Sequence, residues 1–163
     1  MNAVREDTLF EGEEDVLSES VHDTAGESRK YLIFLTDDLK LGVDAEHVVE
    51  IQNNHSITYL PMMPSYIRGI FNMRGQIIPV MDIRLRLGKP EKENESLLVV
   101  LNYNGMQLGI LVDAVDQMID IPNSIVMPMP AQSSQKLVSG MCTIPDGSGT
   151  MLILDCDQLM PHE

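Results

Sequence analysis

Short apolar runs separated by turn-forming residues make up most of the chain from residue 31 onward. Residues 31–35, YLIFL, form a short apolar run of strand-favouring residues, which predicts a buried strand. Asn104-Gly105 is the strongest short hairpin signal in the chain. Because no helical period runs beyond about two turns, the pattern predicts an all-β protein of barrel or sandwich type. The other predicted strands span residues 39–43, 66–71, 76–81, 97–101, 106–112, 137–144 and 150–154.

Two short segments are less decided by their pattern. Residues 48–51 fit either a helical turn or a bent strand. Residues 84–87 fit one helical turn that ends at Gly88 and Pro90.

Three blocks of sequence recur in the same order, which indicates an internal duplication. They pair residues 41–51 with 108–121, residues 56–64 with 124–130, and residues 67–82 with 138–155. The duplication predicts two similar β units, at about 29–94 and 95–163. Units of this size are marginal alone, so we expect them to share apolar surface, and the groove between them suits an elongated partner. Whether strands exchange between the two units stays open.

Charge separates the first 28 residues from the rest. The chain has a net charge of −14, and residues 1–28 hold nine acidic residues and one basic residue. This segment predicts a disordered acidic tail, with a partner-binding motif as the alternative. The overall charge argues against nucleic-acid binding. No run approaches the roughly 18 apolar residues of a membrane span, and no secretory signal is apparent, so we expect a cytoplasmic protein without membrane insertion.

The sequence contains no constellation typical of an enzyme or of a metal or cofactor site. Nucleotide-binding, metalloprotease and serine-hydrolase motifs are absent, and the four histidines are scattered. Cys142 and Cys156 are expected to be small buried hydrophobes. We therefore predict no catalysis, no cofactor and no metal. The acidic stripe at residues 113, 116 and 120 is expected to be a solvated face.

Methionine is frequent beside proline at corresponding places in the two halves. Met62 and Met63 lie in the first half, and Met127 and Met129 lie in the second. They serve either as core filler or as an adaptable apolar binding surface.

Glu50 and Arg74 are isolated charges in apolar surroundings. Glu50 lies between Val49 and Ile51, and Arg74 lies in a tight turn between two predicted strands. We predict that the two side chains form a salt bridge. The alternative is that each is an ordinary exposed residue.

At residues 61–82, PMMPSYIRGIFNMRGQIIPVMD, the chain resembles the CheW family of chemotaxis coupling proteins. The resemblance extends over residues 29–163, with Met73 where the family usually has leucine. It implies two five-stranded SH3-like β-barrels packed together. It also implies a non-enzymatic adaptor in signal transduction, linked to a two-component system.

The same resemblance implies partners and site residues. The partners are the regulatory domain of the histidine kinase CheA and the cytoplasmic tip of methyl-accepting chemoreceptors. Carried over by position, Val48, Glu50, Gly69 and Arg74 belong near the receptor-binding groove. The alternatives are a CheW-like coupler of another chemosensory pathway, such as twitching motility, and a small-ligand-binding β module.

Overall fold

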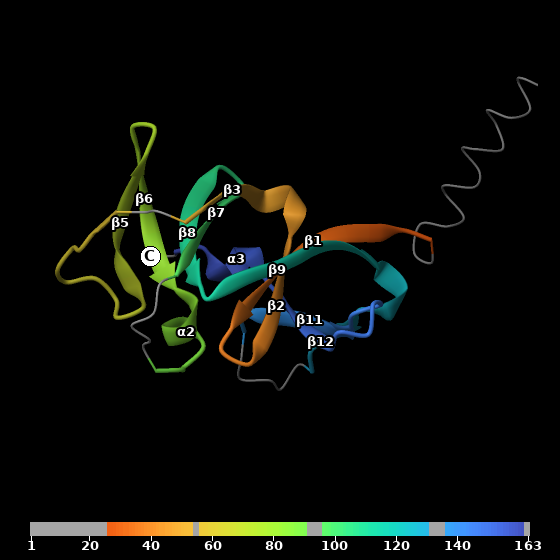
Figure 1. Ribbon diagram of the computed structural model, residues 1–163. Helices are drawn as coiled ribbons and strands as arrows, with labels where there is room; N and C mark the ends of the chain where they lie inside the picture. Colours follow the sequence, from red (N-terminus) through yellow and green to blue (C-terminus); the bar gives the residue numbers. More distant parts are fainter. Residues whose placement is uncertain (1–25, 54–55, 91–95, 131–135, 162–163) are drawn as a thin grey trace, which may run out of the picture.

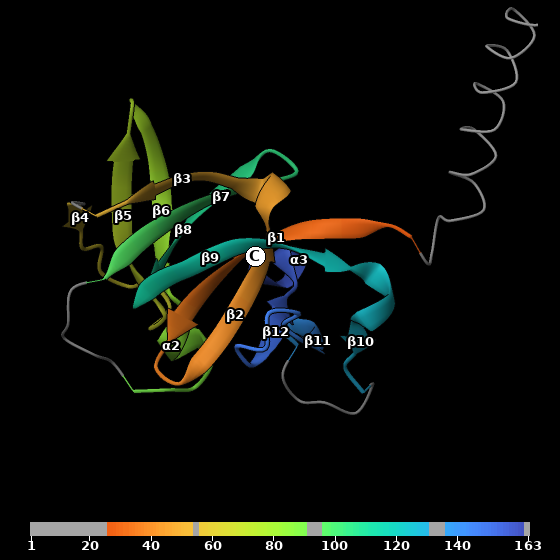
Figure 2. The ribbon, with the colours of Figure 1, turned by 45° about the vertical axis from the view of Figure 1, so that its right-hand side comes forward.

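The computed structural model describes residues 26–53, 56–90, 96–130 and 136–161. Within these ranges, the strands form two six-stranded sheets that lie against each other (Figures 1 and 2). Sheet A consists, in hydrogen-bonded order, of β10 (Met127–Pro128), β11 (Val138–Thr143), β12 (Thr150–Leu154), β2 (Leu39–Asp44), β1 (Ser28–Thr36) and β9 (Ala114–Pro122). Sheet B consists of β3 (Val48–Gln52), β7 (Leu97–Tyr103), β8 (Met106–Val112), β6 (Gln76–Asp82), β5 (Ile67–Met73) and β4 (Ile57–Thr58).

The helices of the described residues are single turns; three of them link strands, and α3 follows the last strand. They are η1 (Ala45–His47), α2 (Ile83–Arg86), η2 (Asn123–Ile125) and α3 (Cys156–Leu159). The predicted all-β class is confirmed. The five-stranded SH3-like form of the two units stays a prediction.

Each sheet takes strands from both halves of the chain. Hairpin β1–β2 lies in sheet A with β9 to β12, and hairpin β7–β8 lies in sheet B with β3 to β6. A parallel pair joins each hairpin to the other half, β2 with β12 and β8 with β6. The sheets therefore do not divide the chain into the expected units at about 29–94 and 95–163. The strand exchange that the sequence left open takes place.

The topology confirms the duplication. When β1 to β6 are matched in turn with β7 to β12, the two sheets have the same strand order. Two glycines at corresponding places in the two halves also have the same packing role. A β-carbon at Gly42 would crowd the Met151 side chain, and one at Gly109 would crowd Leu98. Each glycine thus makes room for a large residue inside its own sheet.

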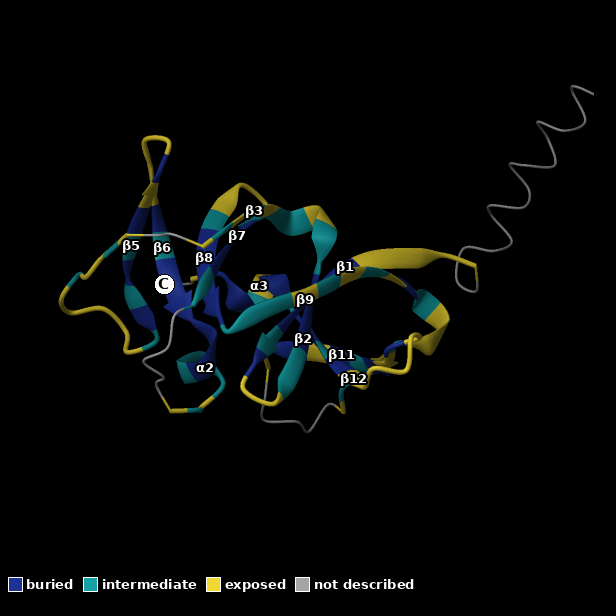
Figure 3. Cartoon of the chain, viewed as in Figure 1, coloured by how far each residue is buried: buried dark blue, intermediate teal, exposed yellow. Residues whose placement is uncertain are grey.

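Three apolar clusters stabilise the arrangement: one inside each sheet and one shared between them. Strand β1 shows how a strand serves two of them. Leu32 and Phe34 enter the shared core, while Tyr31 and Ile33 enter the core of sheet A. This alternation follows from the two-residue period of a strand. Figure 3 shows the resulting buried middle of the molecule. The two sheets share apolar surface through this common core.

Two expectations about individual segments are now decided. Residues 48–52 are a strand, preceded by the helical turn η1. Strand β1 begins at Ser28 opposite Pro122, and the Glu27 carbonyl accepts the Asn123 N–H. Pairing with β9 thus extends order into the end of the expected 1–28 tail, whose residues 1–25 lie outside the described residues. Strand β9 itself is not predicted from sequence, because its acidic and amide residues break the apolar alternation.

Candidate partner-binding surface

Glu50 and Arg74 form the predicted ion pair. Arg74 Nη2 donates to Glu50 Oε1 at 2.7 Å. Glu50 lies on β3, at one end of sheet B, and Arg74 lies at the tip of hairpin β5–β6, beyond β7 and β8 in the strand order. The contact therefore closes sheet B on itself. The Arg74 side chain is largely exposed, while the Glu50 side chain is mostly covered.

The turn that carries Arg74 has a backbone that arginine rarely adopts. Arg74 has φ 53° and Gly75 has φ 87°, the two positive values of a type I′ hairpin turn. The Asn72 side chain accepts the Gly75 N–H at 3.0 Å. Hairpin β7–β8 has the same design, but there the first turn residue is Asn104, with φ 53°. Asparagine tolerates this conformation and arginine does not favour it, so the turn alone does not explain Arg74.

Glu50 is ionised at neutral pH. A hydrogen bond from the Gln52 side chain lowers the pKa of Glu50, and the bond from Arg74 lowers it further. Because both partners are donors, they favour the carboxylate. The ion pair therefore exposes the positive charge of Arg74, while both oxygens of the Glu50 carboxylate accept hydrogen bonds from Arg74 and Gln52.

Val48 and Glu50 face different sides of sheet B. A register shift between them places Val48 opposite Leu101 and Glu50 opposite Val100. Leu101 belongs to the shared core and Val100 to the core of sheet B. Val48 accordingly packs against the shared core rather than standing free.

Gly69 is buried in β5, and it has no side chain to offer a partner. A β-carbon there would overlap the Thr58 carbonyl oxygen of β4, and its φ of 151° is unfavourable for other residues. The structure thus brings Glu50 and Arg74 together and gives Gly69 the role of admitting β4.

Exposed apolar side chains lie near the ion pair and on the β4–β5 connection. Val49 and Ile51 flank Glu50 on β3 and are both exposed. Tyr59 and Met62 lie on the connection, and Met62 is 99% exposed. Figure 3 shows this connection and the β5–β6 tip as exposed segments. We define the β3 surface as Val49, Glu50, Ile51 and Arg74.

The proline-flanking methionines divide between the two alternatives. Met62, Met63 and Met127 are exposed, so the core-filler alternative is wrong for them. Met129 packs against the shared core, so the core-filler alternative is correct for Met129.

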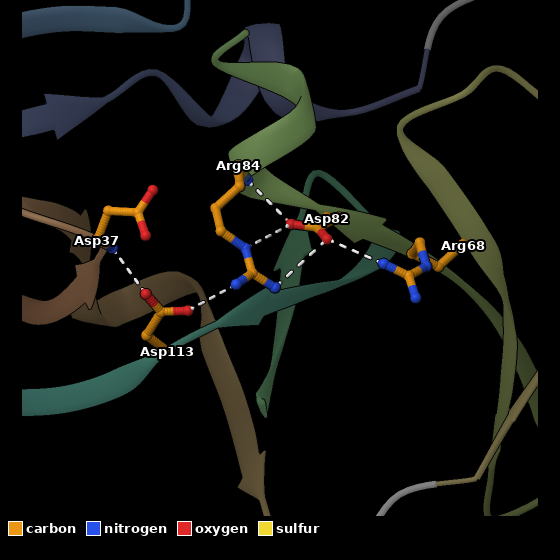
Figure 4. A network of polar contacts seen from close by, with 5 residues as sticks. All are labelled: Asp37, Arg68, Asp82, Arg84 and Asp113. Atoms are coloured by element: carbon orange, nitrogen blue, oxygen red, sulfur yellow. Dashed lines mark hydrogen bonds and ion pairs between the residues drawn. The ribbon is translucent and has the colours of Figure 1, made fainter. Parts of the chain in front are cut away.

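A buried polar network is the feature that the sequence pattern did not predict (Figure 4). Arg84 is 1% exposed and binds the buried Asp82 and, at 3.0 Å, Asp113. Arg68 also pairs with Asp82, at 3.1 Å. The expected solvated face is therefore wrong for Asp113, which also accepts the Asp37 N–H at 2.7 Å. The sequence signal for this buried network is Arg84, an arginine inside the apolar run that follows Asp82.

The CheW-like domain family model matches residues 30–163. The chain belongs to this family. It is 25% identical to the chemotaxis protein CheW of Klebsiella aerogenes over 151 residues, covering 88% of this chain and 90% of that protein. It is 27% identical to the Helicobacter pylori chemotaxis protein CheW over 124 residues, covering 75% of each. The scaffolding protein TtCheW of Thermoanaerobacter tengcongensis has a similar structure, with a TM-score of 0.73, 29% identity and coverage of 79% and 90%.

This family assigns the chain to the chemotaxis adaptors and supports a non-enzymatic role. Both cysteines of the CheW-like domain are buried, as predicted. Burial raises the pKa of Cys142 and raises that of Cys156 to about 12, so neither thiol is poised as a nucleophile. In the part of the chain that the structure describes, no three His, Cys, Asp or Glu side chains gather as metal ligands. None of the helices described there has the length and apolar character needed to cross a bilayer.

Proposed function

We propose that this CheW-like protein is a scaffold that couples chemoreceptors to the histidine kinase CheA in a bacterial chemosensory array. The observation that carries the proposal is the doubled sheet. Two sheets of the same plan share one core and leave separate outward faces. A rigid body with two faces can hold two partners at once, and holding them in one array raises their effective concentration. The protein thus works in the cytoplasm and reaches the membrane through its partners.

The β3 surface is the proposed receptor contact. β3 ends the strand order of sheet B, Val49 and Ile51 are exposed on it, and Glu50 between them pairs with the cation Arg74. Such a surface suits one face of a helical hairpin, whose apolar residues cover the valine and isoleucine and whose acids approach Arg74. Since most of the contact is apolar, binding should depend only moderately on salt. Val48 supports this surface from the shared core.

The kinase contact is proposed to use the outer ends of the two units. The regulatory domain of CheA is similar to CheW, so a β-unit end meeting a β-unit end is the expected mode. The exposed Met62 and Tyr59 lie on the β4–β5 connection and are candidates for that contact. Exposed methionine adapts to a partner's shape, which suits such a site.

The test mixes the full-length protein with the CheA regulatory domain and a receptor tip fragment from the same cell. Size-exclusion chromatography with light scattering should detect a ternary complex. Ile51→Asp should weaken receptor binding and leave kinase binding unchanged. Ile125→Asp is the matched control, because Ile125 is 38% exposed on η2 while Ile51 is 40% exposed on β3. Mutually exclusive binding of the two partners would contradict the bridging role.

A further inference from the structure

Three cations in and just after α2 reach across from sheet B to elements of sheet A. Arg84 Nη1 donates to Oδ1 of Asp113, the residue between β8 and β9, at 3.0 Å. Arg86 Nη2 donates to the Gln158 carbonyl of α3 at 3.1 Å. Lys89 Nζ lies 3.5 Å from Asp38 Oδ1 in the β1–β2 turn. We call Arg84, Arg86 and Lys89 the α2 latch.

Arg84 is the buried part of the latch. Its guanidinium binds both oxygens of Asp82, which is fully buried, as well as Asp113. A buried guanidinium is costly unless its donors are satisfied, and here carboxylates satisfy them on two sides. Asp113 in turn accepts the Asp37 N–H at 2.7 Å, so the contact continues into the β1–β2 turn of sheet A (Figure 4).

The second half of the chain is an internal comparison, because β12 and α3 repeat β6 and α2 without cations. Asp155 caps α3 as Asp82 caps α2. At the positions corresponding to Arg84 and Arg86 the second half has Asp157 and Leu159. Ser139 stands where the first half has Arg68. The capped helical turn that follows the last strand of each half therefore forms in the second half without these cations, so the latch serves something other than the formation of that turn.

We infer that Arg84, Arg86 and Lys89 are positioning residues that fix sheet A against sheet B and so couple the binding surfaces on the two sheets. The latch joins α2 to the β1–β2 turn, to the β8–β9 junction and to α3, which are the elements where the exchanged hairpin β1–β2 meets the rest of sheet A. Loosening it should let the sheets shift while each sheet stays intact.

The test uses the full-length chain with Arg86→Leu, Lys89→Gln and Asp113→Asn combined. Arg86→Leu copies the second half, and Asp113→Asn keeps an acceptor for the Asp37 N–H while removing the charge that faces Arg84. Arg84 stays paired with Asp82. The matched control is Arg29→Leu with Lys30→Gln, because these two side chains pair with Asp44 and Asp120, which also belong to sheet A.

Hydrogen exchange reports on the latch without any partner. In the triple variant, exchange of the Asp37 amide should quicken about tenfold, because its hydrogen bond to the charged Asp113 carboxylate becomes a weaker bond to a neutral amide oxygen. Amides inside β6 and β12 should keep their protection. In the control variant the Asp37 amide should change less than about twofold. Unchanged protection of Asp37 in the triple variant would overturn the inference. Should the triple variant unfold, Asp113→Asn alone must still quicken Asp37.

A distance measurement tests the placement of the sheets directly. Spin labels at Gln76→Cys in sheet B and Thr150→Cys in sheet A use exposed positions, and the two native cysteines are buried. The distribution of distances should broaden in the triple variant and stay as in the parent in the control. An equally narrow distribution in all three proteins would also overturn the inference.

The functional part of the test rests on the proposed bridging role. The triple variant should bind kinase domain and receptor tip separately with affinities within about twofold of the parent, but the effect of one partner on the affinity for the other should disappear. If the parent protein fails to bind both partners, the proposed function fails, while exchange and distances still decide whether the latch positions the sheets.

Discussion

Replacing Arg74 with asparagine separates the effect of this residue on the stability of the turn from its effect on partner binding. A left-handed backbone costs an ordinary L-residue roughly 1–2 kcal/mol, and asparagine avoids much of that cost. Arg74 has φ 53°, so Arg74→Asn should relieve this strain and form the favoured Asn-Gly type I′ turn. The variant loses the bond to Glu50, but Arg74 is largely exposed, so that loss is the smaller term.

The expected result is a gain of about 1 kcal/mol in the free energy of unfolding, or about 3 °C in Tm. Urea titration and thermal melting followed by circular dichroism measure it. Receptor binding should weaken about tenfold at the same time, because the variant removes the cation of the β3 surface. Stability and binding thus change in opposite directions, which no general loss of structure produces.

The chain offers a reciprocal control in the other hairpin. Asn104→Arg places arginine in the same backbone conformation without Glu50 nearby, so it should cost about 1 kcal/mol and leave receptor binding unchanged. A destabilised Arg74→Asn would refute the reasoning, since the ion pair would then outweigh the turn. Unchanged receptor affinity in that variant would remove Arg74 from the binding surface.

Four further outcomes are expected. Thr36→Val should raise stability by about 1–2 kcal/mol in urea titration, because the Thr36 hydroxyl is buried and has no hydrogen-bond partner within the described residues; a loss would indicate a bound water. Gly69→Ala should lower stability by about 2–3 kcal/mol or more, since its β-carbon would overlap the Thr58 carbonyl of β4. Cys142 and Cys156 should react with a thiol reagent at pH 8 only after unfolding, as a timed absorbance assay would show. Hydrogen bonds from Ser148 and Gln117 lower the pKa of Asp146 to about 2, so its contribution to stability should be complete above its ordinary pKa and lost as the pH falls toward 2; acid titration of Asp146→Ala should lack that component.

The sequence predicted the hairpins because their turn residues and flanking alternation are local signals. Asn104-Gly105 fixes one turn, and the apolar runs on each side can face only inward. The exchange of hairpins between sheets is different. Because β1–β2 and β7–β8 carry the same pattern, each fits either sheet by local criteria, and only the packing of the whole chain decides between them.

The candidate site was also predicted unevenly. Glu50 and Arg74 were found because each is a lone charge in an apolar segment. Asp113 was missed because acidic residues at 113, 116 and 120, three or four positions apart, suggest a solvated face. Its partner Arg84 also lies far from it in sequence. A contact between distant residues leaves no periodic trace, so only the fold reveals it.

The two halves share a backbone plan but differ in the charge that they present. The tip of β5–β6 carries the exposed cation Arg74, while the corresponding tip of β11–β12 carries Asp146, whose pKa of about 2 keeps it ionised at physiological pH. An adaptor with two identical ends would let either partner occupy both. An acidic partner is attracted by Arg74 and repelled by Asp146, so it should bind only at the β5–β6 tip. The choice between the two tips then depends on repulsion as much as on attraction. In the proposed bridging role, the duplication supplies two equivalent frames, and the unequal side chains on them give two different partners separate ends to bind.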